Sequence, residues 1–353
     1  MPHTHENPSP SSNFDASKNY DVAIIGAGPS GLFAAFQCGM LGMSSLVIDA
    51  LSHIGGQCSA LYPEKPIYDI PACPGILAED LVQNLFQQGK DFDISYLLKR
   101  KAVFLEGEAG NFTLTTHQGE KIHAKTIMIA SGPGAFGPNR PPLAQIEEFE
   151  EGGSVHYSVR KASLFTDAFI VIAGGGDSAL DWALALAGKA EKIYLVHRRD
   201  KFRAHQATLD LVEEKVKLGQ IEKITPFQLH RLEGENGKLE KVIVNSLDDE
   251  EKALKATHLL AFFGLSSDLK AVQSWGIGAE KNAIPVNPFT METDLKGVFA
   301  IGDVAKRPGK VKLILQGFAE GSLAARGAWQ IAHPDEALHL EHSTSLCAPK
   351  DKS

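Results

Sequence analysis

Short apolar runs separated by glycine-rich turns recur along the chain, and two of these runs share a pattern that predicts the same structure. The apolar segments 22–25 and 170–173 each lead into a turn of closely spaced small residues, followed by a helical segment. The small residues of the two turns are Gly26, Gly28 and Gly31, and Gly174, Gly176 and Ala179. This spacing permits a tight turn, backbone approach to a pyrophosphate, and close packing of helix against strand. We therefore predict two nucleotide-binding units in which a helix N-terminus faces the phosphates.

The residue 23 positions after the first glycine differs between the two patterns. It is Asp49 in the first and His197 in the second, and His197 is followed directly by Arg198 and Arg199. A carboxylate at this point hydrogen-bonds ribose hydroxyls, whereas basic side chains suit a 2′-phosphate. We therefore predict FAD in the first unit and NADPH in the second. The residues predicted to bind NADPH are Gly174, Gly176, Asp177, Ser178, His197, Arg198, Arg199 and Arg203.

The remaining hydrophobic pattern indicates that the second unit is inserted into the first. Strand character is found over 103–106, 111–116, 121–130 and 297–301, and helical character over 178–189 and 313–332. Glycines and prolines over 132–138 mark one crossing, and Pro285 and Pro288 mark the return. We expect an α/β fold with two Rossmann-like domains, each of three ββα layers. The NADPH domain, 138–286, is expected within a discontinuous FAD domain, 19–137 and 287–345.

Composition excludes some classes of function. The net charge of −8 disfavours a nucleic-acid partner. No apolar run approaches the roughly 20 residues of a membrane span, so no membrane association is expected. Residues 1–18 are rich in His, Pro, Ser and Asn and have no apolar core like that of a signal peptide. We therefore expect a disordered tail and a cytoplasmic protein.

The cysteines argue against disulfide chemistry. A dithiol reductase needs one thiol that attacks and a second that resolves the mixed disulfide. Cys38, Cys58, Cys73 and Cys347 are scattered, with no C-x-x-C spacing, and Pro63 stands where a partner five residues after Cys58 would be required. We interpret Cys58 and Cys73 as small buried side chains. The scattered spacing also disfavours a zinc site, and no metal site is predicted.

Four further features have two interpretations each. The Gly302–Asp303 turn before the last helix is a simple turn or a site where Asp303 accepts from a flavin-linked hydroxyl, and we favour the second. Tyr62 packs on the core or stacks on the flat isoalloxazine ring. His342 lies in a solvated tail or covers the flavin. The basic segment 306–312 is a solvated loop or guides an acidic partner.

Taken together, these residues resemble the ferredoxin–NADP⁺ reductases of the thioredoxin-reductase-like type (type 2), in the pyridine nucleotide-disulfide oxidoreductase superfamily. The resemblance extends over nearly the whole chain after the N-terminal tail, and the missing cysteine pair is itself what separates this type from thioredoxin reductase. The matching strings are 26–31, 55–57, 60–65, 174–183, 197–204, 264–265 and 301–303.

The resemblance implies an FAD enzyme that transfers electrons between two one-electron-reduced ferredoxins and NADP⁺. It implies that Tyr62 stacks on one flavin face and that His342 covers the other from the partner subunit of a homodimer; these two are the predicted catalytic residues. The residues implied to contact FAD outside the glycine turn are Asp49, Gln57, Tyr62, Phe136, Asp303 and Thr344, with Ala102 contributing its backbone.

Two rival functions stay open at this point. The first is an NADPH oxidoreductase with another acceptor, such as flavodoxin, a quinone or a separate disulfide protein. The second is a non-catalytic flavoprotein that senses nucleotides and binds a partner. Two intact nucleotide fingerprints argue against the sensor, since a sensor needs only one.

Overall fold

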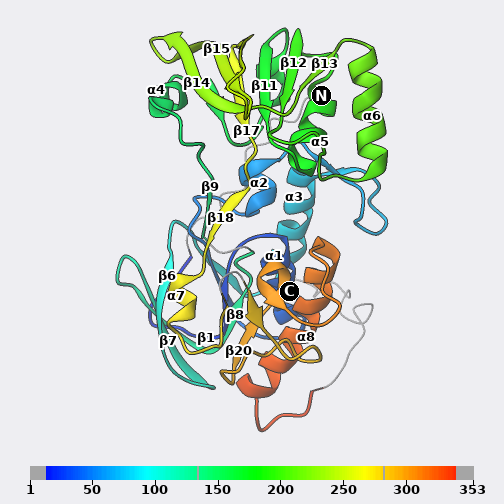
Figure 1. The fold of residues 1–353 in the computed structure, drawn as a ribbon. Helices are drawn as coiled ribbons and strands as arrows, with labels where there is room; N and C mark the ends of the chain where they lie inside the picture. Colours follow the sequence, from blue (N-terminus) through cyan, green and yellow to red (C-terminus); the bar gives the residue numbers. More distant parts are fainter. Residues whose placement is uncertain (1–12, 133–134, 281–282, 339–353) are drawn as a thin grey trace. The chain divides into compact units, whose positions relative to one another are not determined.

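The computed structural model describes residues 13–132, 135–280 and 283–338, which divide into two compact units (Figure 1). The first unit contains residues up to 60, 65–136 and those from 267 onward, and the second contains 61–64 and 137–266. The chain passes between the units at β9 (Ala135–Pro138) and β18 (Leu265–Asp268), and these two strands pair with each other. The main segment of the second unit, 137–266, therefore begins and ends on neighbouring strands.

The first unit is built on a mixed sheet in the order β5-β2-β1-β8-β7-β6, with β20 also paired to β8. The pairs among β5, β2, β1, β8 and β20 are parallel, and β6, β7 and β8 form an antiparallel meander. The strands are β1 (Asn19–Ile25), β2 (Ser45–Ile48), β5 (Ile94–Leu97), β6 (Ala102–Glu108), β7 (Asn111–Thr116), β8 (Lys121–Ile129) and β20 (Val298–Ala300). Every residue of β2 is buried, as expected for a parallel strand covered on both faces.

Three long helices accompany this sheet, and α1 contacts both of the others. They are α1 (Pro29–Met40), α3 (Ala78–Gly89) and α8 (Ile314–Ala332). The contact between α1 and α8 includes small residues, since a Cβ on Gly321 would lie 3.3 Å from the Cβ of Ala34, and an aromatic pair, Phe33 and Phe318, with ring centroids 4.9 Å apart. Shorter elements of this unit are α2 (Gln57–Leu61), β3 (Pro66–Ile67), β4 (Ile76–Leu77), α7 (Lys270–Gln273), β19 (Ile284–Pro285), η2 (Gly302–Val304) and β21 (Ala305–Lys306).

The second unit repeats the plan with a parallel sheet in the order β10-β17-β11-β12-β13, beside an antiparallel sheet of β14, β15 and β16. Its strands are β10 (Val155–His156), β11 (Phe169–Ala173), β12 (Lys192–Val196), β13 (Ile221–Ile224), β14 (Gln228–Glu235), β15 (Lys238–Asn245), β16 (Glu251–Lys255) and β17 (His258–Ala261). Its helices are α4 (Ile146–Glu151), η1 (Ala162–Phe165), α5 (Asp177–Leu186) and α6 (Gln206–Lys217). The predicted α/β class with two Rossmann-like units is confirmed.

Two segments differ from the sequence-based expectation. Residues 13–18, assigned to a disordered tail, are fixed on the first unit: Asn13 Oδ1 accepts from the Tyr96 amide at 2.9 Å, and Lys18 pairs with Asp93 at 2.7 Å. The chain also returns to the first unit before Pro285, because Trp275 is buried in that unit's core. In the part of the chain described here, no helix is long and apolar enough to cross a membrane.

Candidate nucleotide-binding sites

The glycine turn of the first unit has no room for side chains on its inner side. The Gly26 amide donates to the Ile48 carbonyl at 2.8 Å, and a Cβ on Gly26 would lie 2.4 Å from the Ala130 carbonyl oxygen. A Cβ on Gly31 would lie 1.9 Å from the Gly26 carbonyl oxygen. A Cβ on Gly28, in contrast, would meet nothing within 4 Å. The turn is therefore closed against its own sheet and open at Gly28, where α1 begins and a pyrophosphate can approach.

Asp49 lies beside this turn, as its position at the end of β2 predicts. Its carboxylate accepts from the Ala27 amide at 2.7 Å and from the Leu51 amide at 2.8 Å. Burial raises the pKa of Asp49, although the hydrogen bonds from these amides oppose the increase. The Arg100 amide donates to the Asp49 carbonyl at 2.8 Å, which brings the segment leading to Ala102 to the same place. The acid and the Ala102 segment thus meet at one edge of the turn.

The Gly55–Gln57 segment closes on the turn from another side. The Gly55 amide donates to the Ala27 carbonyl at 2.8 Å, and a Cβ on Gly56 would lie 3.1 Å from the Gly28 Cα. Both glycines have positive φ, +106° and +55°, so larger side chains here would strain the backbone and crowd the turn. The side-chain nitrogen of Gln57, Nε2, lies 3.8 Å from the point where a Cβ on Gly132 would stand. Gln57 is therefore placed at the end of β8, next to the glycine turn.

The Gly302–Asp303 turn packs against the N-terminal part of α1. A Cβ on Gly302 would lie 2.9 Å from Ser30 Oγ, and one on Gly317 would lie 2.0 Å from the same atom. The Asp303 carboxylate is half-buried and has no hydrogen-bond partner among the described residues. Asp303 is thus held near the first glycine turn with its carboxylate available to a ligand.

A buried carboxylate that sequence reasoning missed lies directly behind this turn. Glu320 on α8 is 1% exposed. Its carboxylate accepts from the Gly302 amide at 2.9 Å, Arg307 Nε at 3.0 Å and Lys310 Nζ at 2.7 Å. Lys306 pairs with Glu280 at 2.7 Å but is 56% exposed, so within the basic segment it is Arg307 and Lys310 that are held inside the molecule.

The pattern of α8 contains the signal for Glu320. The buried face of the helix includes Gly317, Gly321 and Ala324, and Glu320 occupies a position of the same stripe. A charged residue within an otherwise small and apolar stripe is buried only when it is paired. That rule would have directed attention to Glu320 and to the basic residues before α8.

The first unit also contains a buried polar atom that lacks a partner. Ser131 Oγ is buried and finds no hydrogen-bond partner among the described residues. Ser131 directly follows Ala130, and its Cα would lie 3.0 Å from a Cβ on Gly26. Buried hydroxyls are normally satisfied, and an unsatisfied one marks a place for water or a ligand. The open Gly28, Asp49, Asp303 and Ser131 fit a dinucleotide lying across the carboxyl ends of the parallel strands.

The glycine turn of the second unit repeats the same hydrogen bonds. The Gly174 amide donates to the Val196 carbonyl at 3.0 Å, and a Cβ on Gly174 would lie 2.7 Å from the Phe262 carbonyl oxygen. Gly176, directly before α5, again faces open space, since a Cβ there would meet nothing within 4 Å. Asp177 and Ser178 are exposed in the first turn of α5. This site is therefore open along the helix N-terminus.

The basic residues predicted to follow this turn do gather beside it. The His197 ring lies where a Cβ on Gly175 would stand, 2.1 Å from its Cε1. The Arg203 amide donates to the Gly175 carbonyl at 2.7 Å. Partial burial and the positive charges of Arg198, Arg199 and Arg203 lower the pKa of His197. The three arginines are exposed, so a positive field surrounds His197 at the rim of the turn.

The structure does not bring every predicted residue to the first turn. Tyr62 belongs to the segment 61–64, which packs with the second unit, and its ring lies against that unit's hydrophobic core. Phe136 lies in β9, and nothing is described of its side chain. His342 and Thr344 lie outside the described residues. The covering of the two flavin faces therefore stays a prediction.

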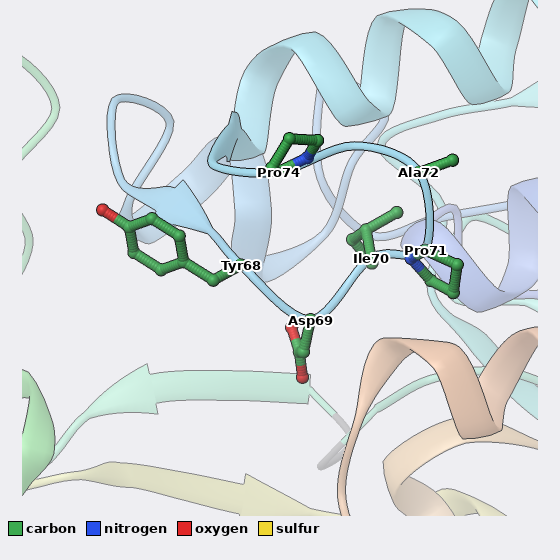
Figure 2. A pocket seen from close by; sticks show the side chains of 6 residues that line it. All are labelled: Tyr68, Asp69, Ile70, Pro71, Ala72 and Pro74. Atoms are coloured by element: carbon green, nitrogen blue, oxygen red, sulfur yellow. The ribbon is translucent and has the colours of Figure 1, made fainter.

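A shallow cavity of about 360 Å³ lies in the loop between β3 and β4 of the first unit (Figure 2). Its lining residues are Tyr68, Asp69, Ile70, Pro71, Ala72 and Pro74. None of them belongs to the predicted cofactor-binding set, and Asp69 is the single carboxylate among them.

Comparison with known proteins decides the family. The family described as pyridine nucleotide-disulphide oxidoreductase matches residues 20–321, a range that contains both glycine turns and Asp303. The chain belongs to this family. The protein named ferredoxin–NADP reductase from Gluconacetobacter diazotrophicus is 57% identical over 93% of this chain and 96% of its own length. The protein of the same name from Gluconobacter oxydans is 53% identical over 94% of this chain and 97% of its own.

Solved structures agree with this family at the level of the fold. Thioredoxin reductase from Lactococcus lactis has a TM-score of 0.76 and 24% identity, covering 90% of this chain and 100% of the other. At this identity the likeness concerns the fold alone. The family and the relatives named ferredoxin–NADP reductase confirm the predicted cofactor pair, FAD and NADP(H).

None of the described cysteines, Cys38, Cys58 and Cys73, forms a disulfide. Burial raises the pKa of Cys38 to about 12, so this thiol is not a nucleophile at neutral pH. Cys58 is buried in α2, and Cys347 lies outside the described residues. The burial of Cys58 agrees with the prediction that it is a small buried side chain, whereas Cys73, predicted to be buried as well, is only partly buried in its loop between β3 and β4.

Proposed function

We propose that this protein is a ferredoxin–NADP reductase. In the reaction, two reduced ferredoxins, NADP⁺ and one proton yield two oxidised ferredoxins and NADPH, or the reverse. Bound FAD supplies this chemistry because it exchanges electrons singly with an iron–sulfur protein and as a pair with a nicotinamide. The observation that carries the proposal is the pair of glycine turns, one beside the carboxylate of Asp49 and the other beside three exposed arginines. The identity to the relatives of that name supports it.

In this proposal the first unit holds FAD. The pyrophosphate lies at Gly28 and the N-terminus of α1, where the turn is open. Asp49 binds ribose hydroxyls, Asp303 accepts from the flavin-linked chain, and Gln57 and the Ala102 backbone line the site. Phe136, Thr344, Tyr62 and His342 complete it, with His342 and Thr344 contributed by the C-terminal segment.

The second unit holds NADP(H). Gly176 and the first turn of α5 receive the pyrophosphate, and Arg198, Arg199 and Arg203 bind the 2′-phosphate with His197. The exposure of these arginines suits a nucleotide that enters and leaves in each turnover. The homodimer, the cytoplasmic location and the use of flavodoxin in place of ferredoxin are finer parts of the same proposal.

Anaerobic stopped-flow spectroscopy with the holoenzyme tests this function. NADPH should bleach the flavin absorbance, NADH should do so far more slowly, and oxidised ferredoxin should then restore the absorbance while its iron–sulfur centre is reduced. Restoration by flavodoxin, a quinone or a disulfide protein, but not by ferredoxin, would assign another acceptor. A flavin that NADPH leaves oxidised would mean that the protein is a nucleotide sensor.

A further inference from the structure

Glu320 is the most deeply buried charged side chain near the predicted FAD site. Its carboxylate touches an amide of the Gly302–Asp303 turn and two cations, Arg307 and Lys310, from the segment before α8. The Lys310 side chain is 8% exposed and contacts both carboxylate oxygens, at 2.8 and 2.7 Å. Such burial is tolerated only when charges are paired and hydrogen-bonded. Glu320 therefore constrains every group that pairs with it.

The turn held by Glu320 has little freedom on its other side. Gly302 has a positive φ of +72°, and Ser30 Oγ lies 2.9 Å from the place of its missing Cβ. Ser30 is in the first turn of α1, directly after the open Gly28–Pro29 segment. The Gly302–Asp303 turn is thus packed between α1 and the carboxylate of Glu320. A displacement of Glu320 would be passed directly to Asp303.

We propose that Glu320 is a positioning residue for FAD, whose carboxylate fixes the Asp303 turn through the Gly302 amide while Arg307 and Lys310 balance its charge. This inference rests on the proposed role of Asp303 in FAD binding. Glu320 itself does not touch the cofactor in this proposal. Its contribution is to hold the Asp303 carboxylate at the place where a flavin-linked hydroxyl arrives, before FAD binds, so that less ordering is required on binding.

The first unit provides a matched ion pair away from the site. Lys125 Nζ lies 2.8 Å from Asp21 Oδ1, and the side chain of Asp21 is 12% exposed. Asp21 precedes Gly26 by five positions on β1, so the pair lies roughly 16 Å away along the strand. Breaking it should destabilise the unit without moving Asp303. Lys125→Met therefore serves as the control.

The experiment compares Glu320→Ala, Glu320→Gln and Lys125→Met with wild type. FAD is removed, and its dissociation constant is measured by flavin fluorescence, alongside the visible spectrum of bound FAD and the thermal unfolding of the apoprotein. Glu320→Ala leaves the Gly302 amide unsatisfied, so FAD affinity should fall about 10- to 100-fold and the flavin spectrum should change. Glutamine retains an oxygen that can accept from the Gly302 amide, so the FAD affinity of Glu320→Gln should fall only about threefold to tenfold.

Lys125→Met should lower the unfolding temperature and leave FAD affinity and spectrum as in wild type. The proposal is overturned if Glu320→Ala binds FAD within twofold of wild type, or if glutamine restores nothing relative to alanine. Should Glu320→Ala not fold, unchanged FAD affinity in Glu320→Gln overturns it equally. Failure of the proposed function is a separate outcome, in which the wild-type protein binds no FAD or passes no electrons to ferredoxin.

Discussion

The two glycine turns are the same construction used for two kinds of occupant. In each, the first glycine amide donates to a carbonyl at the end of the neighbouring strand, at Ile48 in one and Val196 in the other. The donor and the acceptor are each displaced by 148 residues between the two units. They differ in what stands beside the turn. Asp49 is hydrogen-bonded back into its own turn, whereas the arginines beside the second turn are exposed.

This difference shows how one fold can hold a resident cofactor at one site and exchange a nucleotide substrate at another. Around the first turn, Asp49, the Gly55–Gly56 segment and the Gly302 turn are hydrogen-bonded or packed in place before a ligand arrives, which favours tight and lasting binding. Around the second, the nucleotide meets an exposed positive field that accelerates encounter and leaves release easy. A resident cofactor suits the first arrangement, and a substrate that turns over suits the second.

The largest effect is expected at the exposed arginines. Changing both Arg198 and Arg199 to serine should raise KM for NADPH by roughly 100-fold or more, because each charge-assisted contact to a phosphate is worth about 10- to 100-fold. KM for NADH should change little. Steady-state kinetics with both nucleotides measures this, with the exposed Arg231→Ser on β14 as the matched control. Equal losses for NADPH and NADH would show that the pair does not select the 2′-phosphate.

The next largest effect is expected at the third small residue of each turn, Gly31 in the first and Ala179 in the second. Gly31→Ala places a methyl group 1.9 Å from the Gly26 carbonyl oxygen, an overpacking that should cost about 3 kcal/mol and release FAD. The second turn already carries Ala179 at this position, so Ala179→Gly should cost only about 1 kcal/mol as a helix glycine. Thermal unfolding and FAD content per protein measure both. If Gly31→Ala kept its FAD and its stability, the tight packing of the first turn would be irrelevant to binding.

A smaller effect is expected at Asp49. Asp49→Asn keeps the size of the side chain but removes its charge. It also replaces one of the two oxygens that accept hydrogen bonds from backbone amides. FAD affinity should fall about tenfold, the loss of one charge-assisted hydrogen bond, and KM for NADPH should stay the same. Fluorescence titration of the apoprotein with FAD checks this against Asp93→Asn, an exposed control in the same unit. An unchanged FAD dissociation constant would remove Asp49 from the site.

The smallest effect concerns pH at the second turn. Burial and the neighbouring arginines lower the pKa of His197 in the absence of nucleotide, and a bound 2′-phosphate raises it. NADPH binding then takes up a proton, so affinity increases a few-fold as pH falls through the raised pKa, and levels off below the lowered one. The phosphate itself protonates near pH 6 and acts oppositely. The difference between wild type and His197→Gln isolates the histidine, and identical pH profiles would contradict its role.

The local parts of this molecule could be predicted from sequence, and the long-range parts could not. The glycine spacing predicted both turns, and the position 23 residues after Gly26 identified Asp49. Both predictions work because strand–turn–helix geometry fixes these distances within one unit. For Glu320, the helical pattern of α8 marks the position as buried, but it does not show which groups of the preceding loop pair with the carboxylate. The covering of the flavin by Tyr62 and His342 stays a prediction, since the Tyr62 side chain lies against the core of the second unit and His342 lies outside the described residues.

The pairing of β9 with β18 has a consequence for the history of the gene. A segment whose two ends lie side by side can enter a host domain, or be removed from it, without parting the host's strands. The second nucleotide-binding unit meets this condition, and its repeat of the first unit's turn is what a duplicated copy would leave behind. A single insertion would be enough to join a site for a retained cofactor to a site for an exchangeable one on one polypeptide.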